Sequence, residues 1–344
     1  MIIVQTASRL HFGLLSLPCG PRWPDRQGQE TIPARQFGGV GLMVQSPGIE
    51  LRIRPAKDWR AHGPLAERAL ALAHRFMNFI HSEDDDLSCR LRGLTPPAQE
   101  IILERCAPEH AGLGTGTQLG LAVARGLSLA WDGRLPAKDL CLRVDRAARS
   151  ALGFHGFFHG GFLVEAGKNR DSEIAPLVVR EHFPQDWRVV LAIPIGETGL
   201  SGIKETEAIE ELLAHGIPMQ HTEKMCRLVL LGLLPALKED DIKSLGEALF
   251  DFNSLAGQPF AKFQGGPYAS PRIAALIQFI RGQGIAGAGQ SSWGPTVFAI
   301  VEDEARANDL AAKIRQTFSL PENEVLVTSA CNEGARVKEM FEGE

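Results

Sequence analysis

A glycine-rich loop that runs directly into an apolar helical stretch constrains this chain more than any other feature. Residues 108–124 have the sequence PEHAGLGTGTQLGLAVA. Glycine allows the backbone to approach a ligand closely and to adopt conformations closed to other residues. The first turn of the helix that follows offers unpaired N–H groups and a partial positive charge. The stretch therefore predicts a phosphate site, with the candidate ligands Gly112, Gly114, Thr115, Gly116 and Thr117.

The loop differs from the two commonest nucleotide-binding motifs. A P-loop of the form GxxxxGK[ST] needs a lysine, which this stretch lacks, and the loop does not match the GxGxxG of a Rossmann unit. A purely structural alternative stays open, in which the glycines only permit tight packing at the entry to the helix.

The composition is that of a globular protein, and it excludes several function classes. The chain has 344 residues, 44% hydrophobic and 22% charged, which suggests one large or two medium domains. A formal net charge of −5 gives no basic signature for nucleic acid. We expect no membrane span, because no apolar run reaches about 18 residues, and the N-terminal segment lacks a signal-peptide pattern. The six cysteines are scattered without CxxC spacing, which indicates reduced thiols in a cytoplasmic protein.

Hydrophobic periodicity predicts a mixed chain that becomes more helical in its second half. Strands are predicted over 2–7, 10–17, 37–45, 49–55, 87–93, 99–106 and 186–194, with SPG as a turn between the third and fourth. Helices are predicted over 64–80, 116–131, 137–148, 204–214, 220–237, 240–254 and 270–281. The chain then ends in strand, glycine loop, strand, helix and strand. The proline- and charge-rich residues 18–35 are expected to form a loop, and a domain boundary is expected near 180–185.

Two further glycine-rich segments accompany the first. Near the N-terminus, SRLHFG at 8–13 is followed by FGGVG at 37–41. The third segment, GAGQSSWGPTVFAI at 287–300, holds the candidate ligands Gly287, Gly289, Ser291 and Ser292. For this segment, a ligand-binding loop and a simple turn between strands are both compatible with the residues.

Taken together, these segments resemble the motifs of the GHMP kinase superfamily. P-x-x-x-G-L-G-T-G-T at 108–117 is similar to its central motif, GAGQSSWGP to its C-terminal glycine motif and SRLHFG to its N-terminal motif. Longer phrases are similar to one branch, the beta-ribofuranosylaminobenzene 5'-phosphate synthase family. These phrases are SRLHFGLL, FGGVGL, EHAGLGTGTQL, RSALGFHGFFHGGFLVEAG and GAGQSSWGPTVFA. The resemblance covers nearly the whole chain.

The resemblance implies an α+β fold, the two-domain GHMP kinase-like fold. Its N-terminal domain, similar to ribosomal protein S5 domain 2, would span 1–182 and carry the glycine-rich phosphate loop. A ferredoxin-like α/β sandwich would span 183–344. The implied enzyme is a phosphoribosyl-transferring, decarboxylating synthase, a transferase of tetrahydromethanopterin biosynthesis. It joins 4-aminobenzoate to phosphoribosyl pyrophosphate and releases carbon dioxide and pyrophosphate, with Mg²⁺ as the expected cofactor.

That reaction asks for an anion cradle, for cations that bind the carboxylate or the 5-phosphate, and for an apolar slot that holds a flat ring. The glycine loop would supply the cradle, and arginine suits both anions because its fork binds them in bidentate fashion. The candidate catalytic residues are Arg9, His11, Arg149, His155 and His159. Arg35 also lies beside a family motif, and the candidate ring walls are Phe154, Phe157 and Phe158.

The sequence leaves the metal ligands undetermined. Glu109, Glu165 and Glu197 are acidic candidates for Mg²⁺, but none of them stands in a ligand cluster. His155 and His159 lie four residues apart, as metal-sharing histidines on a helix do, yet the glycines around them argue against a helix. A role in proton handling or phosphate contact and a purely structural role both stay open for these histidines.

Two competing functions are kept beside the synthase. A GHMP kinase usually carries an aspartate after a glycine pair, and HGGFLVEAG has Glu165 there, which weakens the case for phosphoryl transfer to an alcohol. The runner-up is an ATP-dependent small-molecule kinase, the one alternative in which ATP is a cofactor. The third is a non-catalytic homologue that binds a nucleotide or phosphosugar. The expected partners are small molecules rather than nucleic acid or membranes, and a homodimer is left open.

Overall fold

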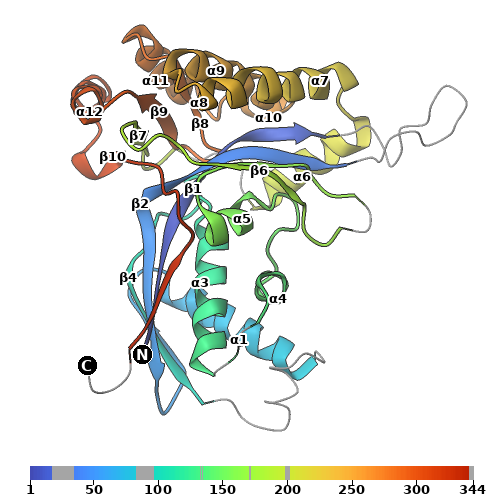
Figure 1. Ribbon diagram of the computed structural model, residues 1–344, viewed down its shortest axis with the longest axis vertical. Coiled ribbons are helices and arrows are strands. Elements are labelled where there is room, and N and C mark those ends of the chain that lie inside the picture. Colours follow the sequence, from blue (N-terminus) through green and yellow to red (C-terminus); the bar gives the residue numbers. More distant parts are fainter. Residues whose placement is uncertain are drawn as a thin grey trace, which may run out of the picture.

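The structure is a computed structural model, and it describes residues 1–17, 35–82, 97–131, 133, 135–169, 172–197 and 202–340. Within these ranges the strands form one seven-stranded sheet and one four-stranded sheet, which are covered by helices (Figure 1). Across the same residues, no helix has both the length and the apolar character that a membrane crossing requires. The predicted strand over 87–93 and most of the predicted loop over 18–35 lie outside the described residues.

The seven-stranded sheet is built around two long antiparallel strands, β1 (Ile2–Ser16) and β2 (Phe37–Pro55). Its path runs β11-β1-β2-β4-β3, and β5 pairs with both β2 and β6. The remaining strands are β3 (Arg60–His62), β4 (Gln99–Arg105), β5 (Phe162–Glu165), β6 (Leu177–Glu181) and β11 (Arg336–Glu339). Side chains alternate between buried and half-buried along the start of β1, as expected for a strand with one face on the core.

The predicted turn at SPG is wrong, because β2 runs straight through it. Thr6 pairs with Ile49 and Ser8 with Val44, so β1 advances two residues (8 − 6) while β2 advances five (49 − 44). The surplus residues of β2 bulge out of the ladder there. Pairing with a single long partner therefore keeps the two predicted halves of β2, and likewise those of β1, in one continuous strand each.

Four helices accompany this sheet: α1 (Ala66–Ser82), α3 (Thr115–Ala130), α4 (Ala137–Arg143) and α5 (Leu152–His159). The helix α3 is buried along most of its length and packs on the sheet, where a Cβ at Gly126 would lie 2.6 Å from Cδ1 of Ile53. The helix predicted over 137–148 stops earlier, because Asp145 and Ala147 have positive φ angles of 54° and 61°. Left-handed residues cannot continue a right-handed helix.

The glycines of GFHGFFHGG were expected to prevent a helix, and α5 corrects that expectation. A Cβ at Gly156 would lie 2.2 Å from Sδ of Met43, and one at Gly153 would lie 3.0 Å from Cγ2 of Thr117. These glycines therefore let α5 approach β2 and α3 closely. Tertiary packing outweighs the low helix propensity of glycine here.

The second half of the chain forms the four-stranded antiparallel sheet, with the order β10-β7-β9-β8. Its strands are β7 (Arg188–Ala192), β8 (Gly287–Gln290), β9 (Val297–Val301) and β10 (Val325–Thr328). The longer helices are α6 (Gly202–His215), α7 (Met219–Leu228), α9 (Ile242–Gly257), α11 (Pro271–Gly282) and α12 (Glu304–Phe318). The shorter ones are η1 (Val229–Leu233, a π-helix), α8 (Leu234–Lys238), η2 (Gln258–Phe260), α10 (Ala261–Gln264) and η3 (Glu322–Glu324).

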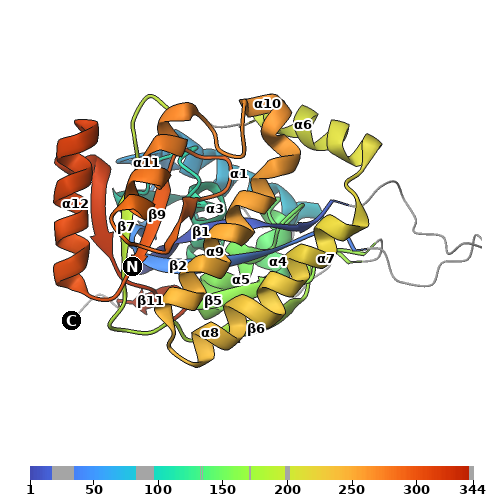
Figure 2. The ribbon, with the colours of Figure 1, turned by 90° about the horizontal axis from the view of Figure 1, so that it is seen from above.

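Helix α9 joins the two halves of the molecule. It runs beside β8, and seen from above it crosses β1 (Figure 2). The approach to β1 is close, since a Cβ at Gly13 would lie 2.3 Å from Cβ of Ala256. The strand β11 also links the halves, because this last strand of the chain pairs with β1. The division at residues 182 and 183 falls between β6 and β7, and it stays a prediction.

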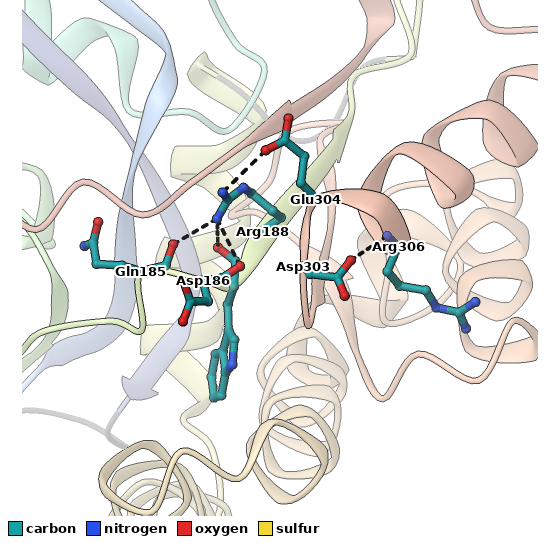
Figure 3. A network of polar contacts seen from close by, with 7 residues as sticks. Gln185, Asp186, Arg188, Asp303, Glu304 and Arg306 are labelled. Atoms are coloured by element: carbon teal, nitrogen blue, oxygen red, sulfur yellow. Dashed lines mark hydrogen bonds and ion pairs between the residues drawn. The ribbon is translucent and has the colours of Figure 1, made fainter.

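A polar network ties the start of β7 to the start of α12 (Figure 3). The Arg188 guanidinium donates to the backbone oxygens of Gln185 and Asp186 and lies 3.5 Å from the Glu304 carboxylate. The Asp303 side chain caps α12 by accepting from the Arg306 amide at 2.8 Å. These contacts join the start of β7, an inner strand of the second sheet, to α12, and none of these residues lines the cavity described next.

Candidate functional site

A cavity of about 430 Å³ opens where β1, the glycine loop before α3, and the α9–α10 region meet. One part of its wall is basic and comes from β1, α1, the start of α3 and the turn after α4. The other part is largely apolar and comes from α6, α9, η2, the residues after α10 and Trp293. Figure 1 shows α3 on one side of β1 and α10 on the other.

The glycine loop forms part of the basic wall and has the conformation that its sequence requires. Gly112 and Gly114 have φ angles of +84° and +71°, and Gly114 is the residue that precedes α3. All five predicted phosphate ligands of this loop line the cavity. Thr115, however, donates its hydroxyl to the Pro108 carbonyl at 2.8 Å, so its side chain holds the loop in shape. The Thr117 amide donates to the Gly114 carbonyl at 3.0 Å, so the amides of Thr115 and Gly116 are the anion donors of the first helical turn.

Ser291 fastens the three glycine-rich segments into one unit. Its hydroxyl donates to the Gly112 carbonyl at 2.7 Å and accepts from the His11 amide at 3.0 Å. The Ser292 amide donates to the His11 carbonyl at 2.8 Å, and the Arg9 amide donates to the Leu113 carbonyl at 2.9 Å. The predicted grouping of Ser291 with the glycine loop is thus present in space, with Ser291 as the connector and Ser292 in the cavity wall.

Four arginines line the cavity, and two of them were missed from the sequence. Arg9 and Arg149 were predicted, whereas Arg68 on α1 and Arg146 after α4 were not. A Cβ at Gly116 would lie 2.7 Å from Nη2 of Arg68 and 3.7 Å from Nη2 of Arg146. Both guanidinium groups therefore reach the first turn of α3. Their combined charge makes this wall suited to a multiply charged anion.

Acidic side chains in the wall offset only part of this charge. Glu109 forms an ion pair with Arg68, and Asp145 lies 3.1 Å from Arg75, outside the cavity lining. Burial and the charge of Arg68 lower the pKa of Arg146, whose Nε has no hydrogen-bond partner among the described residues. Four arginines face two carboxylates in the described lining, so this wall keeps a net positive charge for an incoming anion.

His11 is a neutral imidazole in the cavity wall. Its side chain is 4% exposed, and burial together with the neighbouring Arg9 charge holds its pKa well below the usual value. A Cβ at Gly39 would lie 3.0 Å from Nε2 of His11, so the glycines of FGGVG make room for the ring. Its Nδ1 has no hydrogen-bond partner among the described residues. A neutral imidazole can offer a ligand one hydrogen bond there.

Glu165, at the end of β5, holds the segment that carries Arg149. Its carboxylate accepts from the Ser150 hydroxyl at 2.6 Å and from the Ala151 amide at 2.7 Å. The side chain is fully buried and does not line the cavity. Burial raises the pKa of Glu165 to about 7, although both hydrogen bonds and the Arg9 charge oppose the rise. Glu165 therefore acts within the protein, behind the cavity wall.

Comparison with known proteins agrees with this geometry. The family profile described as GHMP kinases C terminal matches residues 233–320. The beta-ribofuranosylphenol 5'-phosphate synthase of Methanothermobacter thermautotrophicus is 27% identical, over 97% of this chain and 98% of the relative. The synthase of the same name from Methanocaldococcus jannaschii is 28% identical, over 98% and 100%. The chain belongs to this synthase family, within the GHMP kinase superfamily. It is therefore an enzyme of the synthase type.

Kinases and other members of the superfamily share the fold. The 4-diphosphocytidyl-2-C-methyl-D-erythritol kinase of a Cyanothece strain is 32% identical, over 70% of this chain and 69% of the relative. The structure of homoserine kinase from Cytophaga hutchinsonii superposes with a TM-score of 0.64 at 16% identity, over 98% of this chain and 97% of that one. Mevalonate diphosphate decarboxylase from Staphylococcus aureus superposes with a TM-score of 0.57. The α+β, two-domain GHMP kinase-like fold is confirmed.

Several residues in the synthase family motifs lie away from the cavity. His155 contacts the Ala175 carbonyl through Nε2 at 2.8 Å, and the exposed His159 lies beside it with ring centroids 6.4 Å apart. Neither lines the cavity. No group of three or more metal-ligating side chains occurs among the described residues. Arg35 donates to the Gly167 carbonyl at 3.0 Å and is also outside the lining.

Gly287 and Gly289 belong to β8 and also lie outside the cavity lining. A Cβ at Gly289 would lie 2.4 Å from Oδ1 of Asn253, and a Cβ at Gly246 would lie 2.5 Å from the Gly287 amide nitrogen. In this family member the two predicted ligands therefore allow α9 to pack tightly on β8. This is the strand-and-turn alternative that the sequence left open.

The predicted ring walls are wrong for this cavity. Phe154 and Phe157 are buried in the core between the first sheet and α3, and Phe158 packs against the same core. The aromatic side chains that line the cavity are Phe12, Phe260, Tyr268 and Trp293. No local motif marks Phe260 or Tyr268, which come from the helical second half. Their contribution depends on how that half folds over β1.

Proposed function

We propose that this enzyme joins 4-aminobenzoate to phosphoribosyl pyrophosphate and releases carbon dioxide and pyrophosphate, as a step toward a methanopterin-type cofactor. The bond between C1 of the ribose and the pyrophosphate oxygen breaks, and a bond forms from C1 to the ring carbon that bears the carboxylate. The bond to the carboxylate then breaks, and its electron pair restores the aromatic ring. Because the two archaeal relatives are named as ribofuranosylphenol phosphate synthases, 4-hydroxybenzoate is the competing acceptor.

The observation that carries the proposal is the basic wall around the glycine loop. Phosphoribosyl pyrophosphate presents a pyrophosphate and a 5-phosphate, and departure of pyrophosphate builds further negative charge on the leaving oxygens. The first turn of α3 with Arg68 and Arg146 would hold the pyrophosphate, as the distances at Gly116 support. Arg9 and Arg149 would then bind the 5-phosphate or the carboxylate of the acceptor.

Mg²⁺ would bind at this site together with the substrate, whose phosphate oxygens would supply most of its ligands. Hard cations take oxygen ligands and bind at phosphate-transfer sites through one or two carboxylates together with substrate phosphates. Glu109 and Asp145 are the carboxylates of the described lining, and either would complete such a set with pyrophosphate oxygens. The ion would supply charge neutralisation on the leaving group.

The burial and hydrogen bonds of Glu165 favour the synthase over a kinase. A kinase needs a group that orients or deprotonates the acceptor hydroxyl. Glu165 occupies the corresponding motif position, but it is buried, hydrogen-bonded at both oxygens and absent from the cavity lining. The proposed reaction needs no such base, because loss of carbon dioxide, rather than of a ring proton, restores aromaticity.

The test uses 4-aminobenzoate labelled on its carboxyl carbon, mixed with purified protein, phosphoribosyl pyrophosphate and Mg²⁺. We expect release of labelled carbon dioxide that requires both substrates, and a parallel assay with 4-hydroxybenzoate ranks the two acceptors. Arg146→Ala is expected to raise KM for phosphoribosyl pyrophosphate by about 10- to 100-fold, the value of a lost charge-assisted hydrogen bond. Arg105→Ala is the matched control, because Arg105 pairs with Glu50 and neither residue lines the cavity.

A small-molecule kinase is the second candidate, favoured by the kinase relatives and the shared glycine loop. It predicts ATP consumption with an alcohol acceptor and no release of carbon dioxide. ATP turnover in a panel of small alcohols, with silence in the labelled-carboxylate assay, would replace the synthase proposal by the kinase.

A further inference from the structure

The apolar part of the cavity contains polar atoms that the proposed chemistry at the basic wall does not use. Gln264 ends α10, next to Gly265, and lines the cavity. Its Oε1 is buried and has no hydrogen-bond partner among the described residues. Around it the wall is aromatic and aliphatic, with Phe260 and Trp293 packed edge to face at a centroid distance of 3.9 Å.

Tyr268 presents a second polar atom in the same part of the wall. The residue is 9% exposed, and its buried hydroxyl faces the Ser254 side chain, with no second partner among the described residues. Burial raises the pKa of Tyr268, against the opposing effect of the hydrogen bond with the Ser254 side chain. The phenol therefore stays protonated and can both donate and accept.

Neighbouring side-chain amides in the same wall have hydrogen-bond partners, which distinguishes them from Gln264 Oε1. Asn253 donates to the Phe12 and Gln290 carbonyls at 2.7 and 2.8 Å and accepts from the Gln290 amide at 2.8 Å. Gln290 in turn accepts from the Ala269 amide at 2.7 Å and donates to the Ser292 carbonyl at 3.0 Å. A buried polar atom without a partner costs about 1–3 kcal/mol. Gln264 Oε1 is such an atom, and the Tyr268 hydroxyl keeps hydrogen-bonding capacity beyond its contact with Ser254. Both residues line one cavity, and together they indicate a place for a polar ligand group.

The geometry of the proposed reaction would bring the para substituent of the acceptor to the part of the wall that holds Gln264 and Tyr268. Pyrophosphate occupies the α face of phosphoribosyl pyrophosphate, so a β product requires attack from the opposite face. Helices α9 and α10 lie across β1 from α3 (Figure 1), so with pyrophosphate at the start of α3 the acceptor ring would occupy the α9–α10 side of the cavity. The carboxylate-bearing carbon lies nearest the ribose, and the para substituent therefore points away from the ribose, toward Gln264 and Tyr268.

Building on the proposed function, we propose that Gln264 Oε1 and the Tyr268 hydroxyl together recognise the para substituent and select benzoates that carry a hydrogen-bond donor there. A para amino group donates one N–H to each oxygen. A para hydroxyl donates to Gln264 and accepts from Tyr268. A para methyl group fills the same volume but gives neither oxygen a hydrogen bond.

The test must separate recognition from reactivity, because a para donor also activates the ring. Benzenesulfonates keep the anionic group but do not lose carbon dioxide. Dissociation constants for 4-aminobenzenesulfonate and 4-methylbenzenesulfonate are measured by calorimetry, with inorganic pyrophosphate and Mg²⁺ present. We expect the wild-type enzyme to prefer the amino compound by about 10- to 100-fold, from two hydrogen bonds. Gln264→Leu and Tyr268→Phe should each reduce that ratio severalfold and leave binding of the methyl compound nearly unchanged.

Controls and a spectroscopic readout complete the experiment. Gln278→Leu removes an exposed glutamine on α11 and should keep the wild-type ratio. Tyr268 is the single tyrosine of the chain, so 3-fluorotyrosine labelling gives one ¹⁹F resonance. That resonance should shift more with the amino compound than with the methyl compound.

The outcomes distinguish this inference from the proposed function. Equal affinity for the two sulfonates in wild type, absence of binding, or a ratio unaltered in both variants would overturn the role of Gln264 and Tyr268, whatever the turnover. Absence of labelled carbon dioxide release from wild type would overturn the proposed function. The sulfonate ratio would still be measured directly in that case, because it does not depend on turnover.

Discussion

The two glycine-rich segments around Gly114 and Gly289 have similar composition but opposite surroundings. At Gly114 the backbone has φ +71° and lines the cavity beside Arg9. At Gly289 the backbone is in a strand, and the missing side chain leaves room for Asn253 of α9. In the first segment glycine allows a conformation and access to a ligand, and in the second it allows one element to lie against another.

This difference explains why glycine content by itself overpredicts ligand contacts. A glycine-rich loop predicts a phosphate site because the missing side chains leave room for a ligand beside the backbone. A neighbouring helix can fill the same room. Only the identity of the facing element separates the two uses. The variants below place a side chain in each space and compare the loss of activity with the loss of stability.

The largest expected effect is on activity, in Gly114→Asp. The new carboxylate would lie beside Arg9, since a Cβ there comes within 3.1 Å of its Nε, and its charge would repel the pyrophosphate. We expect kcat/KM for phosphoribosyl pyrophosphate to fall by about 10³-fold or more. The left-handed backbone adds about 1–2 kcal/mol of destabilisation.

Gly196→Asp is the matched control for Gly114→Asp. Gly196 has φ +94° with no atom within 4 Å of a Cβ and does not line the cavity, so this variant carries comparable backbone strain and the same charge away from the glycine loop. Carbon dioxide release and thermal unfolding are measured for both. Equal activity in the two variants would contradict the role of the glycine loop.

Gly289→Val is expected to act on stability. A Cβ at this position meets Oδ1 of Asn253 at 2.4 Å and Cζ of Phe298 at 2.8 Å, so α9 must move away from β8. We expect the free energy of unfolding to fall by about 3 kcal/mol, as measured in urea. Gly287→Ala is the milder control, because its nearest contacts are 3.2 and 3.4 Å. If Gly289→Val kept its stability but lost activity, the result would indicate that this segment contacts a ligand.

Glu165 lies behind the wall beside the glycine loop. Ionising this buried carboxyl should lower the free energy of unfolding, an effect that the Gly289 region lacks. Its pKa is raised from 4.5 to about 7, so the folded protein holds this proton more tightly than the unfolded chain does. The free energy of unfolding should therefore fall as pH rises from about 4.5 through about 7, by about 3 kcal/mol at most.

Glu165→Gln should remove that slope between pH 4.5 and 7, since glutamine does not titrate. The comparison uses urea unfolding across the pH range and relies on the slope, because glutamine also changes the hydrogen bonds to Ser150 and Ala151. An identical slope in wild type and variant would show that another group is responsible.

The smallest effect is expected from His159→Ala. His159 is exposed on α5 and lies outside the cavity lining, so turnover should change by less than about twofold, as expected for a surface substitution. Steady-state carbon dioxide release measures it, with His11→Ala as the contrasting variant inside the cavity wall. A tenfold loss in His159→Ala would restore the catalytic role that its motif suggested.

Predictions from the sequence were most successful where short stretches decide the structure. The helix α3, the strand β7 and the glycine loop ahead of α3 were all placed within a few residues. The failures have identifiable causes. The SPG turn was overridden by pairing of β2 with one long strand, and the glycines of α5 by close contact with Met43 and Thr117.

The sequence by itself determined the local elements, the anion-binding loop and, through its motifs, the family. These follow from backbone preferences and periodicity, which act over a few residues. The tertiary structure alone decided that Arg68 and Arg146 meet at Gly116, that Gly289 faces α9, and that Gln264 and Tyr268 close the cavity. The physical reason is that these contacts join segments far apart in the chain, so they depend on how whole elements pack rather than on any local pattern.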